Sequence, residues 1–244
     1  MLRKKNQAEK TSPQGQEKAS SRSQKVLRRL SSLFILLGIL GLCLPLLNNL
    51  LLRRNQTIDL SSLDAESLKR NAESVEYVPM DEIREIGYFN FWSELGKYRP
   101  DEIVGEVFIP SESIALPIFG NARNANLLAG VGQLFPDRRA GEGNYVISGH
   151  RVSGKGILLH NLMDVKEGAA VYITDLETLY IYRVIHTVEK ATDAVNMLSE
   201  DQSDNYGGKP IVSIMTCYNG KSSSRWFVIA ELEETLPYDP DLIQ

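Results

Sequence analysis

A cysteine and an arginine at the facing ends of two apolar runs are the residues of this sequence best suited to covalent chemistry. Residues 211–229, IVSIMTCYNGKSSSRWFVI, have the pattern of a β-strand, a polar loop and a second β-strand. If the two strands pair antiparallel across the loop Tyr218–Ser224, Cys217 and Arg225 lie opposite each other. A guanidinium there can donate to an oxyanion and favour a thiolate, so the pair predicts a cysteine acyl-transfer site.

Such a site needs a proton partner, and three histidines are available. His150 ends the strand-like run NYVISGH directly after a glycine, where a side chain can reach the end of a neighbouring strand. His186 lies within the run LYIYRVIHTVEK and is better explained as a barrel-surface or core residue. His160, in the turn ILLHNLM, is better explained by packing or capping. Position therefore favours His150, although an inert Cys217 with Arg225 merely flanking its strand stays open as the alternative.

Other chemistries find little support in the sequence. The second cysteine, Cys43, lies in a long apolar run, so no disulfide is expected. Three histidines without close His/Cys spacing do not make a zinc site, and no Walker A, HExxH or GxSxG motif occurs. The pair Gly130-x-Gly132 lacks a third glycine and a surrounding βαβ unit. We therefore predict no cofactor and no metal.

The apolar run before the β-rich region predicts a membrane anchor. Residues 33–47, LFILLGILGLCLPLL, extend with Leu30 and Leu50–Leu52 to about the 20 residues that span a bilayer. The alternative, a cleaved signal peptide, lacks a small-x-small cleavage site. Residues 1–30 carry nine Lys and Arg against two Glu, a net of +7. The positive-inside rule then predicts a cytoplasmic N-terminus and an extracytoplasmic domain. The sequence has no second apolar run of that length, so we expect a single-pass protein.

Charge also limits the partners. The whole chain has a net charge of −4, which leaves −11 outside the first 30 residues. An acidic body of this kind argues against nucleic-acid binding, which requires a basic face. Residues 1–24 are rich in Ser, Gln and Lys without apolar periodicity, and we expect them to be disordered.

Short apolar runs with turn signals between them predict a mainly β domain. We expect a closed β-barrel of seven to eight strands with short helices. Helices are expected over 58–77, with Asp59 or Ser61 as a cap, over 81–98, interrupted by Gly87, and over 124–134. The strands are expected at 103–109, 113–119, 143–149, 169–174, 178–188, 211–217 and 225–233. The predicted organisation is a basic cytoplasmic tail (1–30), a transmembrane anchor (31–52), a helical stalk (53–100), the barrel (101–236) and a C-terminal tail (237–244).

Three motifs of the barrel region resemble the sortase family, specifically class A. They are SGH at 148–150, SIMTC at 213–217 and RWFV at 225–228, in the order of the family's histidine, TLxTC and arginine motifs. The run IALPIFGNARNANLLAGVG at 114–132 is similar to the strand followed by a helix near the start of the family's domain. Ser213 and Ile214 depart from the family pattern, where Thr and Leu are usual.

The resemblance implies a function. Cys217 would be the nucleophile, His150 the general acid/base and Arg225 the carbonyl or oxyanion partner. The enzyme would cleave an LPxTG-type sorting signal of a surface protein between Thr and Gly and transfer it to an amine of a cell-wall precursor. The long connection 189–210 would cover the substrate groove, with simple packing of the loop base as the alternative for its apolar residues. The expected substrate-binding residues are Ser148, Val195, Met197, Leu198 and Thr216.

The resemblance also bears on calcium, which some class A members bind through acidic residues ahead of the histidine strand. Phe135 and Arg138 occupy the corresponding stretch here, although Asn144 and Glu200 could match. We expect no required calcium. Two other functions remain as alternatives: an extracytoplasmic thiol peptidase that only hydrolyses, and a non-catalytic anchored β-domain.

Overall fold

The computed structural model describes residues 14–60, 62–83, 88–218 and 221–243. The chain forms two compact units, Met1–Asn48 and Asn49–Gln244. Helix α1 (Gln14–Gln56) supplies the described part of the first unit and continues into the second. Its residues Gln24–Gln56 are long and apolar enough to cross a membrane, with a mean hydropathy of 2.5 over an 18-residue window. The expected disorder of residues 1–24 is wrong for Gln14 onward, because the helix extends back through good helix formers such as Gln, Lys and Ala.

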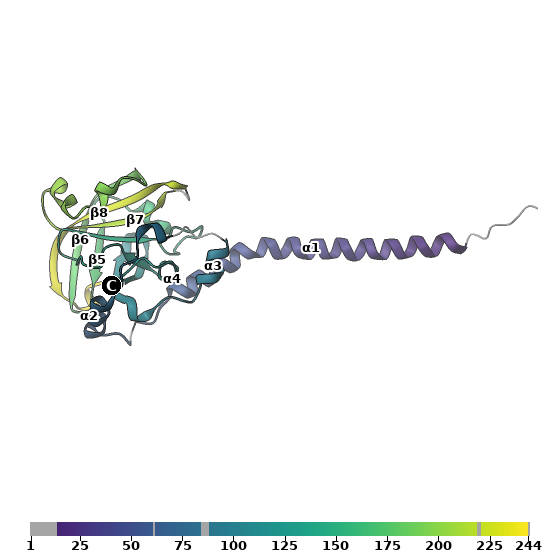
Figure 1. Ribbon diagram of the computed structural model, residues 1–244, viewed down its shortest axis with the longest axis horizontal. Coiled ribbons are helices and arrows are strands. Elements are labelled where there is room, and N and C mark those ends of the chain that lie inside the picture. Colours follow the sequence, from purple (N-terminus) through teal and green to yellow (C-terminus); the bar gives the residue numbers. More distant parts are fainter. Residues whose placement is uncertain (1–13, 61, 84–87, 219–220, 244) are drawn as a thin grey trace, which may run out of the picture. The chain divides into compact units, whose positions relative to one another are not determined.

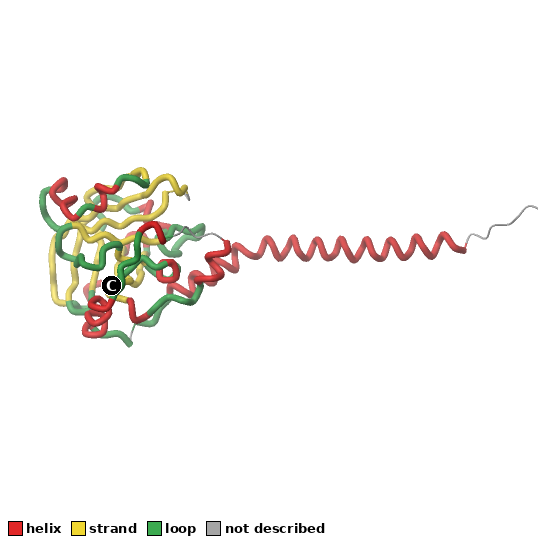
Figure 2. Tube along the Cα trace, viewed as in Figure 1, coloured by secondary structure: helices red, strands yellow, loops and turns green. Residues whose placement is uncertain are grey.

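The second unit confirms the predicted β-barrel. Its strands form one closed barrel in the order β1-β2-β3-β4-β7-β8-β6-β5. Figure 2 shows the strands in yellow gathered into one body, with short helical segments outside them. The strands are β1 (Ile103–Ile109), β2 (Ile114–Phe119), β3 (Val131–Gln133), β4 (Asn144–Gly149), β5 (Ala170–Thr174), β6 (Thr178–Ala191), β7 (Ile211–Tyr218) and β8 (Lys221–Pro237).

Two pairings in this barrel decide where side chains can meet. Strands β4 and β7 are parallel neighbours, in register from Asn144↔Ile211 to Ser148↔Met215. Strand β7 also pairs antiparallel with β8 on its other side. Since parallel strands end at the same edge, residues that follow β4 and β7 come together at one end of the barrel. The labels β7 and β8 in Figure 1 mark these neighbouring strands.

The expected helix over 124–134 is partly wrong. Helix α4 covers only Asn124–Leu127, and Val131–Gln133 form strand β3 between β2 and β4. Gly130 and Gly132 explain the change, because a Cβ at either position would lie 2.4–2.5 Å from a backbone oxygen of the preceding segment. The two glycines thus permit a close backbone approach that a helix would not make.

The segment before the barrel packs on it through short helices. Helix α2 (Ala65–Ser74) is capped by Asp64, whose Oδ1 accepts the Ser67 N–H at 2.8 Å. The cap is therefore Asp64 and not Asp59, while Ser61 lies outside the described residues. The remaining helical elements are η1 (Met80–Glu82), α3 (Tyr88–Glu94), η2 (Pro100–Glu102), η3 (Pro110–Glu112), η4 (His160–Asp164), η5 (Val195–Leu198), η6 (Glu200–Tyr206) and η7 (Pro240–Ile243). Gly87 lies outside the described residues.

Apolar side chains form two cores that matter for the site. The main core fills the barrel with residues such as Ile147, Ile214 and Val228, and it includes Leu52 from the end of α1. A second cluster lies against β7 and β8 and includes Met197 and Leu198 from the connection between β6 and β7. The predicted stalk region contributes Leu68 and Phe91 to buried clusters, so these residues pack against the barrel.

Candidate active site

Three predicted residues meet at one end of the barrel. The β7–β8 register places Cys217 opposite Arg225, as predicted from the hairpin pattern. His150 directly follows β4, the parallel neighbour of β7 on the other side. All three line one small cavity of about 60 Å³. Its other lining residues are Ile83, Leu127, Ser148, Gly149, Met215 and Thr216.

His150 is held in a dry environment. Its side chain is buried, and burial lowers its pKa from 6.5 to about 4. At neutral pH the imidazole is therefore uncharged and able to accept a proton. Its position is fixed from both sides: the Leu159 N–H donates to the His150 carbonyl at 3.2 Å, and the Thr216 hydroxyl donates to the Gly149 carbonyl at 2.8 Å.

Cys217 and Arg225 are more accessible than the histidine. The Cys217 thiol and the Arg225 side chain are both half-buried. One arm of the guanidinium, Nη1, donates to the Ser224 carbonyl at 3.2 Å, which orients the rest of the fork. Beside them, the rings of Tyr218 and Trp226 stack with centroids 5.7 Å apart. A guanidinium carries five N–H donors, so an arginine can serve more than one acceptor.

The structure separates the five predicted substrate-binding residues into two groups. Ser148 and Thr216 line the cavity beside the cysteine. Met197 and Leu198 are buried in the second apolar cluster and do not line this cavity. Val195 lies on η5 with its side chain 65 % exposed.

Three apolar wall residues were not predicted. Met215 lies two residues before Cys217, so strand alternation puts both on one face, and the motif itself contained this signal. Leu127 comes from α4, and Ile83 comes from the segment before the barrel. All three also belong to or pack against the second apolar cluster. The cavity wall therefore continues into the apolar surface that contains Met197 and Leu198.

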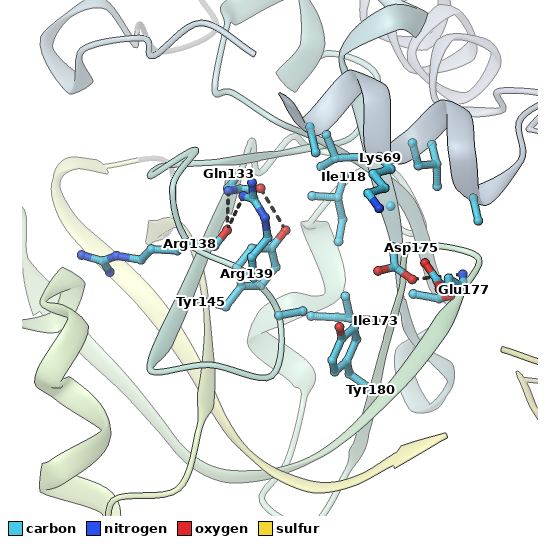
Figure 3. Close-up of a pocket in the computed structure, with 17 residues that line it drawn as sticks. Lys69, Ile118, Gln133, Arg138, Arg139, Tyr145, Ile173, Asp175, Glu177 and Tyr180 are labelled. Carbon is cyan, nitrogen blue, oxygen red and sulfur yellow. Dashed lines mark hydrogen bonds between the residues drawn. The ribbon is translucent and has the colours of Figure 1, made fainter. Parts of the chain in front are cut away.

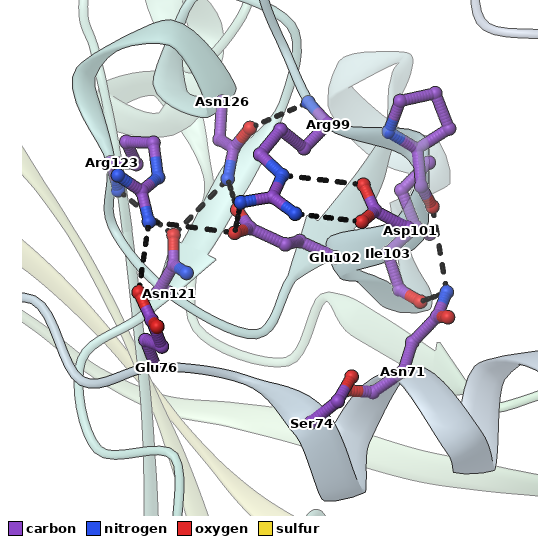
Figure 4. A network of polar contacts seen from close by, with 11 residues as sticks. Asn71, Ser74, Glu76, Arg99, Asp101, Glu102, Ile103, Asn121, Arg123 and Asn126 are labelled. Atoms are coloured by element: carbon purple, nitrogen blue, oxygen red, sulfur yellow. Dashed lines mark hydrogen bonds and ion pairs between the residues drawn. The ribbon is translucent and has the colours of Figure 1, made fainter.

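A buried polar network positions α4 and with it Leu127 (Figure 4). The Asn126 amide donates to Glu102 Oε2 at 2.7 Å and accepts the Arg99 N–H at 3.0 Å. The Glu102 carboxylate, only 7 % exposed, also pairs with Arg99 at 3.3 Å and with Arg123 at 3.5 Å. A buried carboxylate with several donors of this kind defines one geometry, so the network orients the short helix.

A second network ties the connection between β6 and β7 to the barrel. Arg138 Nη1 donates to the carbonyls of Asn144 at 3.1 Å and Leu198 at 2.7 Å, and its guanidinium lies 3.8 Å from the Phe135 ring centroid. The Asn144 amide donates to the Met197 and Ser199 carbonyls at 3.2 and 2.8 Å. Burial lowers the pKa of Arg138, and the nearby carboxylates of Glu200 and Asp137 partly counter this effect.

A larger cavity of about 240 Å³ lies elsewhere on the barrel, under α2 and beside β1 and β5 (Figure 3). Its lining includes Lys69, Tyr145, Asp175 and Tyr180 but no cysteine or histidine. The Gln133 amide in its wall already donates to two backbone carbonyls and accepts from the Tyr145 hydroxyl. This cavity therefore lacks the cysteine and histidine that the smaller cavity brings together.

The smaller cavity can support nucleophilic catalysis. A thiol, a neutral imidazole and a guanidinium facing one space supply a nucleophile, a proton carrier and a cationic donor for an oxyanion. Among the described residues, no group of three or more His, Cys, Asp or Glu is placed to hold a metal ion.

Comparison with known proteins agrees with this chemistry. The family model for the sortase domain matches residues 107–233. Sortase A of Listeria monocytogenes is 27 % identical over 212 residues, 85 % of this chain and 92 % of the relative. Sortase A of Bacillus anthracis is 30 % identical over 129 residues, 53 % of this chain and 59 % of the relative.

Solved structures give the same fold. The crystal structure of the Listeria monocytogenes sortase A has a TM-score of 0.52 at 30 % identity, covering 58 % of this chain and 94 % of that chain. Sortase C-3 of Streptococcus pneumoniae, at 21 % identity and a TM-score of 0.55, shares the fold.

Fold and site together define a cysteine transpeptidase built on a closed β-barrel, of the kind that anchors surface proteins. The chain belongs to the sortase family, and its relatives named Sortase A support class A within it.

Proposed function

We propose that this protein is a single-pass membrane enzyme that cleaves an LPxTG-type sorting signal between Thr and Gly and joins the surface protein to an amine of a cell-wall precursor. The observation that carries the proposal is the shared cavity of Cys217, His150 and Arg225. Helix α1 would be the anchor, with its basic N-terminal side in the cytoplasm and the barrel outside. The anchor would end before Asn49, because Asn49 begins the unit of the barrel and Leu52 is buried in its core, and the catalytic barrel would cover 101–236.

In the proposed mechanism, Cys217 sulfur attacks the Thr carbonyl carbon while His150 accepts the thiol proton. The oxyanion that forms is stabilised by hydrogen bonds from Arg225. Collapse breaks the Thr–Gly C–N bond, and His150 gives its proton to the departing glycine amine. The resulting thioester is then attacked by the acceptor amine, whose proton passes through His150 as the Cys217 thiol is released. Every proton taken up in the first half-reaction is returned, so no cofactor is needed.

The apolar wall suggests how the Leu-Pro portion is bound. Ile83, Leu127 and Met215 line the cavity and also contact the second apolar cluster. A Leu-Pro dipeptide would pack on these three side chains, while the Met197–Leu198 turn supports the wall from beneath. Ser148 and Thr216 would border the scissile peptide. Ile83→Ala and Met215→Ala should therefore raise KM for the peptide with a smaller effect on kcat.

The proposal is tested with the full chain in detergent micelles, an LPxTG peptide and a glycine-based amine, with products read by mass spectrometry. We expect an amine-dependent ligation product and a thioester on Cys217, both absent in Cys217→Ala. Cleavage without any amine-dependent product would favour the purely hydrolytic peptidase. Identical behaviour of wild type and Cys217→Ala would contradict catalysis by this site and favour a non-catalytic domain.

A further inference from the structure

The end of helix α1 is part of the second unit, which begins at Asn49. Leu52 is only 3 % exposed and belongs to the barrel's main core, which also contains Ile157 and Leu158. Residues Asn49–Gln56 are therefore not a loose tether on this unit. They pack on the loop that follows His150.

Polar side chains on one face of this helix end bind the backbone of that loop. Asn49, Arg53 and Gln56 are spaced by four and three residues, so they lie on the same face. Asn49 Nδ2 donates to the Ser153 carbonyl at 2.9 Å. Arg53 Nη2 donates to the Lys155 carbonyl at 2.5 Å. Together with Gln56 they follow the loop along its length.

Gln56 makes the most specific of these contacts. Its Nε2 donates to the Gly156 carbonyl at 3.1 Å, and its Oε1 accepts the Leu158 N–H at 2.8 Å. One amide thus satisfies a carbonyl and an N–H two residues apart, as a neighbouring β-strand would. Leu158 has φ = 47°, a left-handed conformation that is unfavourable for leucine. Such a conformation persists only where surrounding contacts impose it, and the Gln56 amide is one of them.

The residue held in this conformation leads directly back to His150. Arg151 and Leu158 form an isolated antiparallel bridge that closes the loop. The next residue, Leu159, donates its N–H to the His150 carbonyl at 3.2 Å. Its side chain also packs on Gly149, where a Cβ would approach Leu159 Cδ1 to 2.8 Å. A shift of Leu158 would therefore be transmitted to the backbone of His150 through one intervening residue.

We propose that Gln56 is a positioning residue for His150: its side-chain amide fixes the loop Arg151–Leu158, and this loop fixes the imidazole relative to Cys217. The inference rests on the proposed function, because it assumes that His150 carries the proton. Gln56 does not touch the substrate or the reacting atoms. Its loss should therefore affect proton transfer and leave peptide binding at the apolar wall largely unchanged.

The test compares Gln56→Ala, Gln56→Glu and two controls from the same helix turn, all as full chains in detergent micelles. Gln56→Glu keeps the acceptor for Leu158 but loses the donor to Gly156. Asn55→Ala removes a similar bond, Nδ2 to the Leu128 carbonyl at 2.7 Å, that does not reach the His150 loop. Arg54→Ala removes an exposed side chain. The readouts are kcat and KM for ligation and the thermal unfolding midpoint.

For Gln56→Ala we expect kcat to fall roughly tenfold, within the loss of about 100-fold that a 1 Å misplacement can cause, with KM unchanged within about twofold. Gln56→Glu should lie between wild type and Gln56→Ala. Asn55→Ala should lower the unfolding midpoint comparably but retain kcat within about twofold. Arg54→Ala should behave like wild type.

Two results would overturn the inference. One is a wild-type kcat in Gln56→Ala, and the other is an equal loss of kcat in Gln56→Ala and Asn55→Ala, which would reduce Gln56 to a purely structural contact. Both leave the proposed function standing, because wild type would still ligate and Cys217→Ala would not. If wild type forms no ligation product, the proposed function itself fails, and the positioning role of Gln56 falls with it.

Discussion

The buried, uncharged state of His150 makes a quantitative prediction about stability. Burial lowers the pKa of this imidazole from 6.5 to about 4 in the folded protein. Between pH 6.5 and about 4, His150 is therefore mostly protonated in the unfolded chain and mostly neutral in the folded chain. The stability associated with His150 is complete above pH 6.5 and is lost as the pH falls toward 4.

The size of the effect follows from the same two values. One pKa unit corresponds to 1.36 kcal/mol, so the difference between 6.5 and about 4 gives a full loss of about 3 kcal/mol. At pH 5, where the folded-state imidazole is still mostly neutral, the loss is about 2 kcal/mol. His150 is only 7 % exposed, so solvent screening reduces these free-energy losses very little.

The assay compares wild type with His150→Gln, which replaces the imidazole by an amide that does not titrate. The free energy of unfolding of the full chain in micelles is measured by urea denaturation at several pH values between 5 and 7.5, using tryptophan fluorescence. Wild type should lose about 2 kcal/mol more than the variant over this range. Parallel curves for wild type and His150→Gln would refute the reasoning.

Three further substitutions test the surroundings of the site. Arg225→Lys keeps a charge but loses the fork, and kcat should fall about 100-fold, as when an oxyanion donor is removed; an unchanged kcat would exclude the proposed role. Glu102→Ala leaves the Asn126 amide and two guanidinium groups without their buried acceptor, so the free energy of unfolding should fall by about 3 kcal/mol in urea denaturation, and less in Glu102→Gln. Arg138→Met removes both bonds to the Asn144 and Leu198 carbonyls, so limited proteolysis within 192–210 should accelerate and KM should rise, whereas equal proteolysis rates would contradict that link.

Much of the barrel could be predicted because its strands carry local signals. Alternation and turn residues located β1 from Ile103 to Ile109 and placed most other strands within a few residues of their observed ends. Strand β3 was missed because three residues carry too little pattern. Only the pairing with β2 and β4, together with Gly130 and Gly132, determines that this segment is extended. Contacts of this kind produce no apolar periodicity in the sequence from which the strand could be predicted.

The candidate site shows the same division. The pairing of Cys217 with Arg225 was predicted from the two apolar runs and is confirmed, but the expected loop Tyr218–Ser224 is wrong. Tyr218 pairs with Lys221 in the strands, and a register shift between Cys217 and Tyr218 keeps Cys217 opposite Arg225. Ile83 could not be found, because nothing in a polar segment before the barrel indicates that one isoleucine contacts a strand end far along the chain. The docking of Gln56 on the His150 loop was equally hidden, since the helix pattern continued smoothly from the apolar run into it.

The strand order has a consequence for how the protein acquires its activity during folding. His150 directly follows β4 and Cys217 lies near the end of its parallel neighbour β7, with β5, β6 and the long connection between them in the chain. Pairing between segments so far apart in the chain has a high contact order, which slows folding. Arg225 lies on β8, the strand that follows β7 in the chain, so it faces Cys217 only after β8 has paired with β7. A chain whose last strand is not yet in place would therefore carry an unassembled site, and its thiol would gain both partners only when the barrel closes.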